Sequence, residues 1–266
     1  ERRMHEKFQA DLNDLAGRGR LRSLRGRSGT DFTSNDYLGL AESEELRRAA
    51  FDAIARGVPV GAGGSRLLRG NHDEHEALES EAAAYFGAET ALYFGGGYVA
   101  NFAIFSTLPQ RGDLVVHDEL VHASVHEGLR SGRADHVAAA HNNADAFDAA
   151  ITRWRTAGGK GRPWISVESL YSMDGDSPDI AGLFAVADRH EAMIVIDEAH
   201  ATGVLGPQGR GLAAPFEGRE NVITLHTCGK ALGTVGGFIL APRVVRDFLV
   251  NRARPFIFAT APSPLT

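Results

Sequence analysis

Short apolar runs recur along the chain, and most of them are rich in β-branched residues. Runs of this length predict buried strands, because a buried helix needs a longer apolar segment. The expected strands are TALYF (90–94), DLVVH (113–117), PWISVES (163–169), MIVID (193–197) and VITLH (222–226).

Segments with apolar residues at helical spacing separate several of these strands. The expected helices are 1–16, with Met4, Phe8, Leu12 and Leu15 on one stripe, 74–87, which ends at Gly87, 95–108, which opens on a glycine turn, 145–158 and 179–191. Strands that alternate with helices predict an α/β fold with a mostly parallel sheet and helices on both faces. We expect an N-terminal helix and basic arm over 1–45, and a large α/β domain over 46–266.

Composition narrows the class of protein. Of 266 residues, 43% are hydrophobic and 23% charged, which is the balance of a globular chain with a sizeable core. The net charge of −6 argues against nucleic-acid and membrane-surface partners. The single cysteine, Cys228, excludes an internal disulfide and suits a reducing compartment. With no signal peptide and no apolar segment of about 20 residues, we expect a cytoplasmic protein.

The polar residues with chemical potential gather at the ends of the predicted strands. Gly95–Gly97, His117, Glu168, Asp197 and Lys230 all lie at or just beyond a strand end. In open α/β sheets, ligands bind outside the carboxyl ends of the strands. The sequence therefore predicts a site along this rim.

Two of these features are ambiguous when they are taken singly. Consecutive glycines before a helix, as at Gly95–Gly97, can hold a phosphate or can simply make a tight turn. Asp197 ends an apolar strand, and His200 follows three residues later, so a metal site must be weighed. The remaining ligands of a metal set are missing from the sequence, and we expect no metal.

Lys230 resolves the ambiguity, because a buried lysine is costly unless its amine is paired or covalently used. A lysine, a strand-end aspartate and a phosphate cradle on one rim are what pyridoxal 5'-phosphate (PLP) chemistry requires. Lys230 would form the Schiff base, Asp197 would pair with the pyridinium nitrogen, and Gly95–Gly97 would hold the phosphate. His122 could stack on the ring, and the glycines around Lys230 would leave room for it.

The chain resembles the α-oxoamine synthases, a family of fold-type-I PLP-dependent enzymes. The resemblance covers nearly the whole chain in order and rests on SNDYLGL, GAGGSRLLRGNHDEHEALE, GGGYVAN, VHAS, YSMDGD, IDEAHATGVLGPQGRG and HTCGKALG. It implies that Lys230, Asp197 and His122 have the roles above, and that His200 and Ser172 reach the phenolic oxygen of the ring.

Further roles follow from the same resemblance. Gly97 and Tyr98 would present backbone amides to the cofactor, and Thr227 would bind its phosphate. Thr260 would contact the phosphate of a neighbouring subunit in a homodimer, to which the segment Gly61–Gly70 would also contribute. Cys228 is then a small packing residue and not a nucleophile.

On the substrate side, the resemblance implies that Asn35 lies near the amino acid carboxylate and that Arg22 contacts the acyl substrate. The stretch between Arg22 and Thr33 is shorter than in the family, so a solvated arginine in a basic arm stays an equal alternative. The family also continues into a C-terminal α+β domain that supplies an arginine for that carboxylate. We expect this chain to lack that domain and to be inactive alone.

The implied reaction is the decarboxylative condensation of L-alanine with a pimeloyl thioester of CoA or of an acyl carrier protein. Three alternatives stay open. A sister condensing enzyme would share the cofactor residues, and a PLP aminotransferase would share Asp197 and Lys230. A cofactor-free scaffold would have no use for Lys230, Asp197, His122 and His200 together.

Overall fold

The computed structural model describes residues 4–266, so positions 1–3 of the predicted N-terminal helix lie outside the described residues. Contacts divide the chain into two units, Glu1–Ser34 and Asn35–Thr266. The first unit carries helix α1 (Glu6–Gly17) and an irregular basic segment. Helix α1 buries none of its residues, and the predicted apolar stripe of Met4 and Phe8 is exposed.

The residues from Asn35 to 45, which the sequence groups with the arm, have their contacts in the second unit. Gly233 shows why: a β-carbon there would stand 2.6 Å from the carbonyl carbon of Leu40, so the two segments pack backbone to backbone. The division therefore falls after Ser34, whereas the sequence predicted a boundary after residue 45.

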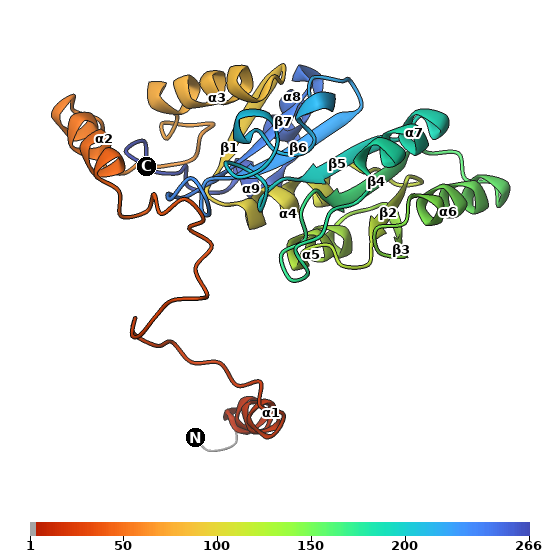
Figure 1. Cartoon of the computed structure of the whole chain (residues 1–266), viewed down its shortest axis with the longest axis horizontal. Helices are drawn as coiled ribbons and strands as arrows, with labels where there is room; N and C mark the ends of the chain where they lie inside the picture. Colours follow the sequence, from red (N-terminus) through yellow and green to blue (C-terminus); the bar gives the residue numbers. More distant parts are fainter. Residues whose placement is uncertain (1–3) are drawn as a thin grey trace. The chain divides into compact units, whose positions relative to one another are not determined.

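The second unit is built on a seven-stranded sheet of order β1-β7-β6-β5-β4-β2-β3 (Figure 1). The strands are β1 (Thr90–Phe94), β2 (Leu114–Asp118), β3 (Asp135–Ala139), β4 (Pro163–Glu168), β5 (Met193–Asp197), β6 (Val222–Thr227) and β7 (Gly237–Ala241). Only β7 runs against its neighbours, β1 and β6. The predicted mostly parallel α/β sheet is confirmed, and all five predicted strands are present. The sequence missed β3, an edge strand with four exposed positions of five, and β7.

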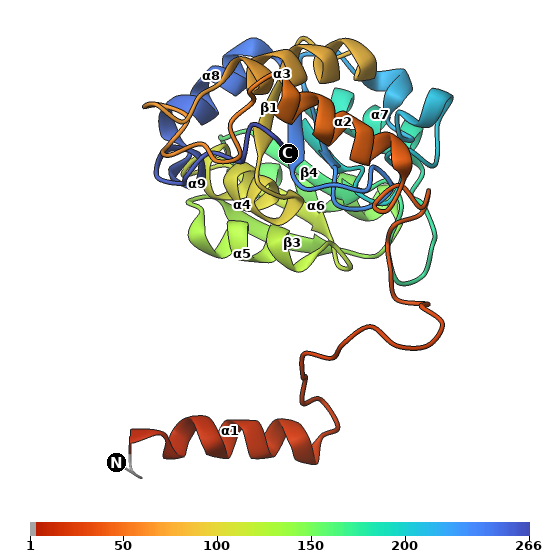
Figure 2. The same cartoon turned by 90° about the vertical axis from the view of Figure 1, so that its left-hand side faces the viewer.

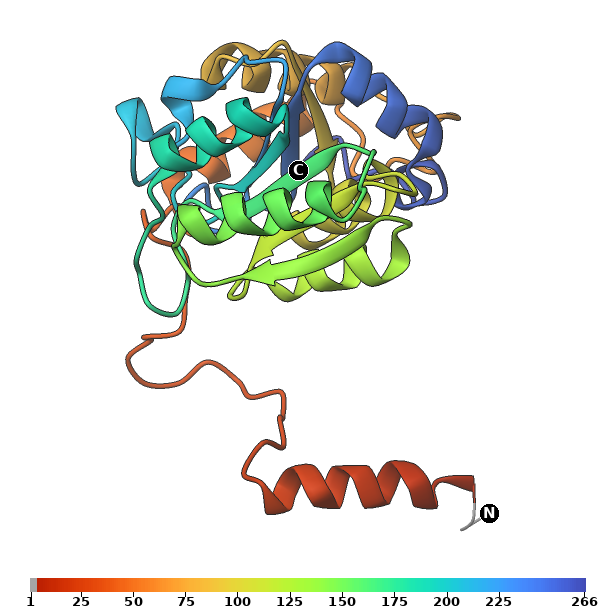
Figure 3. The ribbon, with the colours of Figure 1, turned by 90° about the vertical axis from the view of Figure 1, so that its right-hand side faces the viewer.

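Helices cover both faces of the sheet, as predicted. The helices of this unit are α2 (Glu44–Ala55), α3 (Asp73–Phe86), α4 (Gly97–Thr107), α5 (Ala123–Ser131), α6 (Ala144–Thr156), α7 (Ile180–His190), α8 (Arg243–Arg252) and α9 (Arg254–Ile257). Helices α4 and α5 pack together on one face (Figure 2), and α6 and α7 lie side by side over the other (Figure 3). None of the helices in residues 4–266 has the length and apolar character that a membrane span requires.

Alternating residues of the central strands feed two separate cores. On β5, Ile194 and Ile196 join the core under α6 and α7, whereas Val195 joins the core under α4 and α5. Because successive strand side chains point to opposite faces, a strand covered on both sides must be apolar throughout. Each such side chain stabilises the fold by about 1.5–3 kcal/mol through its burial. This is why these strands appear in the sequence as unbroken apolar runs.

The parallel strands β2, β4, β5 and β6 end at one edge of the sheet. Asp118, Glu168, Asp197 and Thr227 are their last residues, and Glu168 is the register partner of Asp197. The rim that the sequence predicted is therefore a physical edge of the molecule.

Candidate active site

One cavity of about 140 Å³ lies at this rim. It is lined by residues from the ends of β4, β5 and β6, the starts of α4 and α5, and the loops beyond them: Gly97, Tyr98, Asn101, His122, Glu168, Asp197, Ala199, His200, Leu225, Thr227 and Lys230. A larger cavity, of about 540 Å³, involves α4, α8 and α9 and contains none of the predicted site residues. Most of the predicted site residues therefore lie around the smaller cavity.

Lys230 lies in the turn that follows β6 and is partly buried. Burial lowers the pKa of its amine, against the opposing charge of Asp197. The glycines after it have packing duties: a β-carbon on Gly236, whose φ is 115°, would stand 2.3 Å from the Tyr93 hydroxyl. The expectation that these glycines leave room for a cofactor ring is wrong for Gly236, and also for Gly233, which abuts Leu40.

The Lys230 amine begins a chain of hydrogen bonds that leads away from the cavity. Lys230 Nζ lies 2.6 Å from His200 Nε2, and His200 Nδ1 lies 2.6 Å from the Tyr37 hydroxyl. The Tyr37 hydroxyl donates to Asn35 Oδ1 at 3.2 Å. Burial and the nearby Lys230 charge lower the pKa of His200 to about 4, so the ring is neutral and its Nε2 accepts from the amine.

Asp197 faces the cavity from the end of β5 and is 7% exposed. Its Oδ1 accepts from the Ala199 N–H at 2.9 Å, and its Oδ2 accepts from Asn101 Nδ2 at 2.7 Å. Asn101 is buried, and its Oδ1 has no hydrogen-bond partner among the described residues. The sequence did not single out Asn101, although it stands inside the quoted GGGYVAN motif.

The start of α4 offers an anion-binding surface. Its N-cap, Gly96, makes no side-chain capping bond, so the first N–H groups of the helix have no side-chain cap. A β-carbon on Gly97 would stand 3.5 Å from the Thr227 side chain, which shows that the two residues lie close together. Thr227 is the last residue of β6 and lies beside that helix start. Its hydroxyl donates to the Gly236 carbonyl at 3.1 Å.

His122 and Glu168 complete the wall. His122 is the N-cap of α5, where its Nδ1 accepts from the Ser124 N–H at 3.2 Å, and its ring stands edge-on to Tyr98 at 6.1 Å. Burial and the adjacent Asp197 carboxylate raise the pKa of Glu168 to about 8. The sequence placed Glu168 on the rim without a role, and the structure makes it part of the cavity.

Some predicted site residues lie elsewhere. Ser172 and Thr260 are exposed and do not line the cavity, and Arg22 belongs to the first unit. Asn35 is exposed and reaches the cavity only through Tyr37 and His200.

Two other expectations concern Cys228 and metals. Cys228 is buried against the β1–β7 side of the sheet, and burial raises the pKa of its thiol to about 12, which suits a packing residue. Within residues 4–266, one set of side chains has the spacing of a metal site, and it consists of His141, Asp174 and Asp176, away from the cavity.

Comparison with known proteins places this geometry in a class. The family model described as aminotransferase class I and II matches residues 27–266. The chain belongs to this family, whose cofactor is PLP and whose fold it shares.

Curated relatives narrow the comparison. The chain is 39% identical to an 8-amino-7-oxononanoate synthase of Geobacter sulfurreducens, over 98% of this chain and 69% of the relative. It is 44% identical to that of Burkholderia thailandensis, over 91% and 61%. The chain thus spans less than the full length of these relatives.

Solved structures agree on the fold. A serine palmitoyltransferase from S. paucimobilis, solved with PLP and myriocin bound, is 27% identical with a TM-score of 0.86, over 98% of this chain and 69% of that one. The 8-amino-7-oxononanoate synthase of Francisella tularensis is 28% identical with a TM-score of 0.72, over 90% and 66%.

The cavity fits PLP group by group. PLP carries a phosphate, an aldehyde and a ring nitrogen. The uncapped start of α4 beside Thr227 suits the phosphate, the Lys230 amine suits the aldehyde, and the Asp197 carboxylate suits the nitrogen. The partnerless Oδ1 of the buried Asn101 is a further acceptor at the same wall.

Proposed function

We propose that the protein condenses L-alanine with a pimeloyl thioester to give 8-amino-7-oxononanoate, with release of CO2 and the free thiol. One observation carries the proposal: the amine, the carboxylate and the helix start that PLP requires line a single cavity. The named relatives support the particular reaction, since they are 37–44% identical over most of this chain.

When bound, PLP supplies an electron-withdrawing ring that stabilises negative charge on the amino acid Cα. Lys230 moves the proton at that Cα, and its lowered pKa favours the neutral amine that accepts it. Asp197 holds the proton on the ring nitrogen, while the Ala199 and Asn101 donors fix the orientation of its carboxylate. Thr227 and the backbone amides of Gly97 and Tyr98 bind the phosphate.

The remaining wall residues orient and shield the reacting atoms. His122, which lines the cavity, would pack against the ring face and assist carboxylate loss. His200 is neutral and hydrogen-bonded on both nitrogens, so it holds the Lys230 amine in place. Its proposed contact with the phenolic oxygen requires that one of these two bonds is released. Ser172 is proposed to approach the same oxygen, and Asn35 the amino acid carboxylate.

A serine palmitoyltransferase-type reaction is the second candidate, because solved enzymes of that name share the fold with TM-scores up to 0.86. The two candidates differ in the amino acid and the acyl chain and share the cofactor chemistry. A pocket that accepts the methyl of alanine discriminates against glycine by only about 10–200-fold, so glycine should be a poor substrate and not an inert one.

The test is product mass. The full-length protein, purified and loaded with PLP, is offered L-alanine, glycine or L-serine with pimeloyl, malonyl or palmitoyl thioesters. We expect 8-amino-7-oxononanoate from L-alanine with the pimeloyl thioester. A preference for L-serine with the palmitoyl thioester would replace this reaction by the second candidate.

We further propose a homodimer in the cytoplasm, with Thr260 and the segment Gly61–Gly70 reaching the partner's site and with CoA or an acyl carrier protein as the acyl donor. Arg22 is proposed to contact the acyl chain. Sedimentation of an active monomer would exclude the dimer, and equal rates with the two donors would exclude a requirement for the carrier protein.

A further inference from the structure

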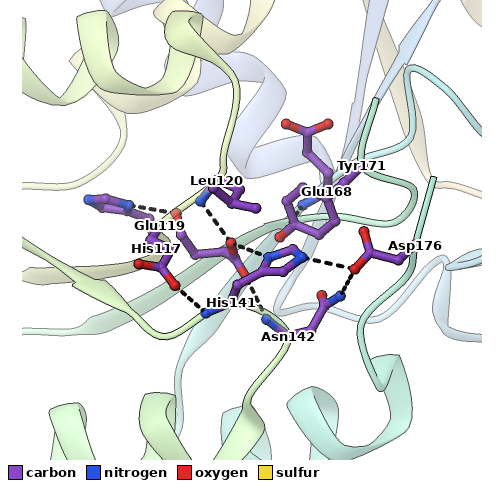
Figure 4. A network of polar contacts seen from close by, with 9 residues as sticks. His117, Glu119, Leu120, His141, Asn142, Glu168, Tyr171 and Asp176 are labelled. Carbon is purple, nitrogen blue, oxygen red and sulfur yellow. Dashed lines mark hydrogen bonds and ion pairs between the residues drawn. The ribbon is translucent and has the colours of Figure 1, made fainter. Parts of the chain in front are cut away.

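A second polar network lies at the end of β2, outside the residues that line the cavity (Figure 4). Asp118 is fully buried, and its carboxylate accepts from the Leu120 N–H at 2.9 Å and the Asn142 N–H at 2.8 Å. His141 Nδ1 stands 2.8 Å from Asp118 Oδ1. The other ring nitrogen, Nε2, stands 3.0 Å from Asp176 Oδ2.

This arrangement defines the charge on His141. A carboxylate only accepts hydrogen bonds, and a neutral imidazole has a single N–H to donate. His141 can therefore serve Asp118 and Asp176 together only as an imidazolium with both nitrogens protonated. Each contact is then a charge-assisted hydrogen bond, which is stronger than a neutral one.

Asp176 belongs to the loop 171–176 that follows β4, the YSMDGD segment of the sequence. The loop is closed on itself, since the Tyr171 N–H donates to the Asp176 carbonyl and the Gly175 N–H donates to the Tyr171 carbonyl, both at 2.9 Å. Its tip is open to solvent, with Met173 90% exposed. Contacts at its base therefore decide where the tip lies.

Tyr171 links the loop base to the cavity wall. The ring is 3% exposed and meets His141 edge-on at 4.6 Å. Its hydroxyl accepts from the Glu168 N–H at 3.3 Å, and Glu168 lines the cavity. The network thus runs from Asp176 through His141 and Tyr171 to the strand end at which the cavity begins.

We propose that Asp118, His141 and Asp176 form an ionic clasp that positions the loop 171–176 beside the active site, with His141 as the positioning residue. The clasp fixes Asp176 to the end of β2, and the loop closure carries that restraint to Tyr171 and Gly175. Because Ser172 lies in this loop, the clasp would also position Ser172 for its contact with the cofactor. That consequence rests on the proposed function, whereas the restraint on the loop does not.

The clasp is pH-dependent. Burial disfavours the charged ring, but the hydrogen bonds to Asp118 and Asp176 outweigh it and raise the pKa of His141 above its usual value. Tyr171 faces the ring as well, Asp174 lies within reach of it, and Glu119 accepts from the backbone N–H of His141 at 2.9 Å. Once the pH passes the raised pKa, one ring N–H is lost and one carboxylate loses its His141 donor. Asn142 Nδ2 still donates to Asp176 Oδ2 at 2.8 Å, so the hold on the loop is weakened and the loop loosens.

The experiment is hydrogen–deuterium exchange of the loop in the whole protein between pH 6 and 9, corrected for the intrinsic rate. Exchange at Tyr171 and Gly175 should rise with pH in the wild type. In His141→Gln, which can serve only one carboxylate and does not titrate, exchange should be about tenfold faster at pH 6 and independent of pH. His136→Gln is the matched control, because His136 is an exposed histidine on β3 outside the clasp.

Asp176→Asn gives a second route that leaves the buried Asp118 bonded to His141. It should loosen the loop in the same way and bring the His141 pKa, followed by NMR, down toward its usual value. Unchanged exchange in both variants, or an equal effect of His136→Gln, would overturn the clasp. So would slower loop exchange on addition of Zn²⁺ to the wild type, since a metal ion held by His141, Asp174 and Asp176 would then fix the loop in place of the clasp.

These measurements need neither substrate nor turnover. Loss of loop protection in His141→Gln supports the clasp even if the protein makes no 8-amino-7-oxononanoate. Product formation combined with an unaltered loop would reject the clasp and leave the proposed function standing.

Discussion

Asp197 and Asp118 end two strands of the same sheet that are separated by β4, and their surroundings differ. Both are buried carboxylates at the carboxyl ends of parallel strands, β5 and β2. Asp118 accepts from two backbone N–H groups and from His141, so the protein itself satisfies it. Asp197 has two protein donors and faces a cavity that also contains the Lys230 amine.

The difference shows how to separate a structural carboxylate from a functional one. Burial alone does not discriminate, since Asp118 is the more buried of the two. Glu198, directly after Asp197, is also fully buried, and it accepts from Ser169, Leu212 and Ala213. A carboxylate that protein donors surround holds loops together, and one that opens on a cavity is available to a ligand.

The largest effect should come from the cavity side. Lys230→Ala should lower the rate of Cα-proton exchange by about 10²–10⁴-fold, because the group that moves the proton is gone. Borohydride reduction of the wild type with PLP should attach the cofactor to Lys230, as found by peptide mapping. A label on another lysine would contradict the central role of this residue.

Asp197→Asn should leave the fold intact and still bind PLP, since the amide can accept from Ala199 as the carboxylate does. Cα-proton exchange should fall by about 10²-fold or more, because the ring nitrogen is no longer held protonated. NMR of deuterium uptake into L-alanine measures this. A normal exchange rate would make Asp197 as structural as Asp118.

Asp118→Asn is the converse change. It should lower the free energy of unfolding by about 3–5 kcal/mol, because it removes one partner of a buried ion pair. Urea denaturation measures the loss, and the unfolding slope should stay constant. The absorbance of bound PLP at saturating cofactor should be retained. A variant that is as stable as the wild type but cannot bind PLP would contradict the assignment of Asp118 as a structural carboxylate.

The two regions also share a direction of pH dependence. His141, with its pKa raised above 6.5, contributes stability that is complete below that value and is lost as the pH rises through the folded-state pKa. Glu168, raised to about 8 by burial and by Asp197, stays protonated in the folded protein, so stability falls as the pH rises from about 4.5 to about 8. Thermal melts of His141→Gln and Glu168→Gln should each remove one part of the slope.

The smallest effect is expected at Cys228, which packs under β7 and does not line the cavity. Cys228→Ala should cost about 1 kcal/mol or less through the small void it leaves. Cofactor attachment and Cα-proton exchange should be unchanged. A large loss of activity at unaltered stability would give the thiol a role that its burial does not predict.

The sequence by itself determined the sheet, the rim and the principal residues of the cavity. Strands covered on both faces must be apolar at every position, so their runs can be seen without a structure. The end of α3 at Gly87 could be predicted as well. A glycine where the helical pattern breaks is typical of a helix end, and Gly87 adopts the left-handed conformation expected there, with φ of 87°. Lys230, Asp197 and Gly97 followed because the ends of parallel strands meet at one edge, and His200 followed from the resemblance to the α-oxoamine synthases.

Only the tertiary structure decided the partners. Tyr37 joins His200 across 163 positions of sequence. His141, which follows β3, joins Asp118 at the end of β2 and Asp176 in the loop after β4. The edge strand β3 has no apolar run, since solvent covers most of it. Hydrogen bonds of this kind depend on which loops the sheet order brings together, and local sequence patterns carry no record of that order.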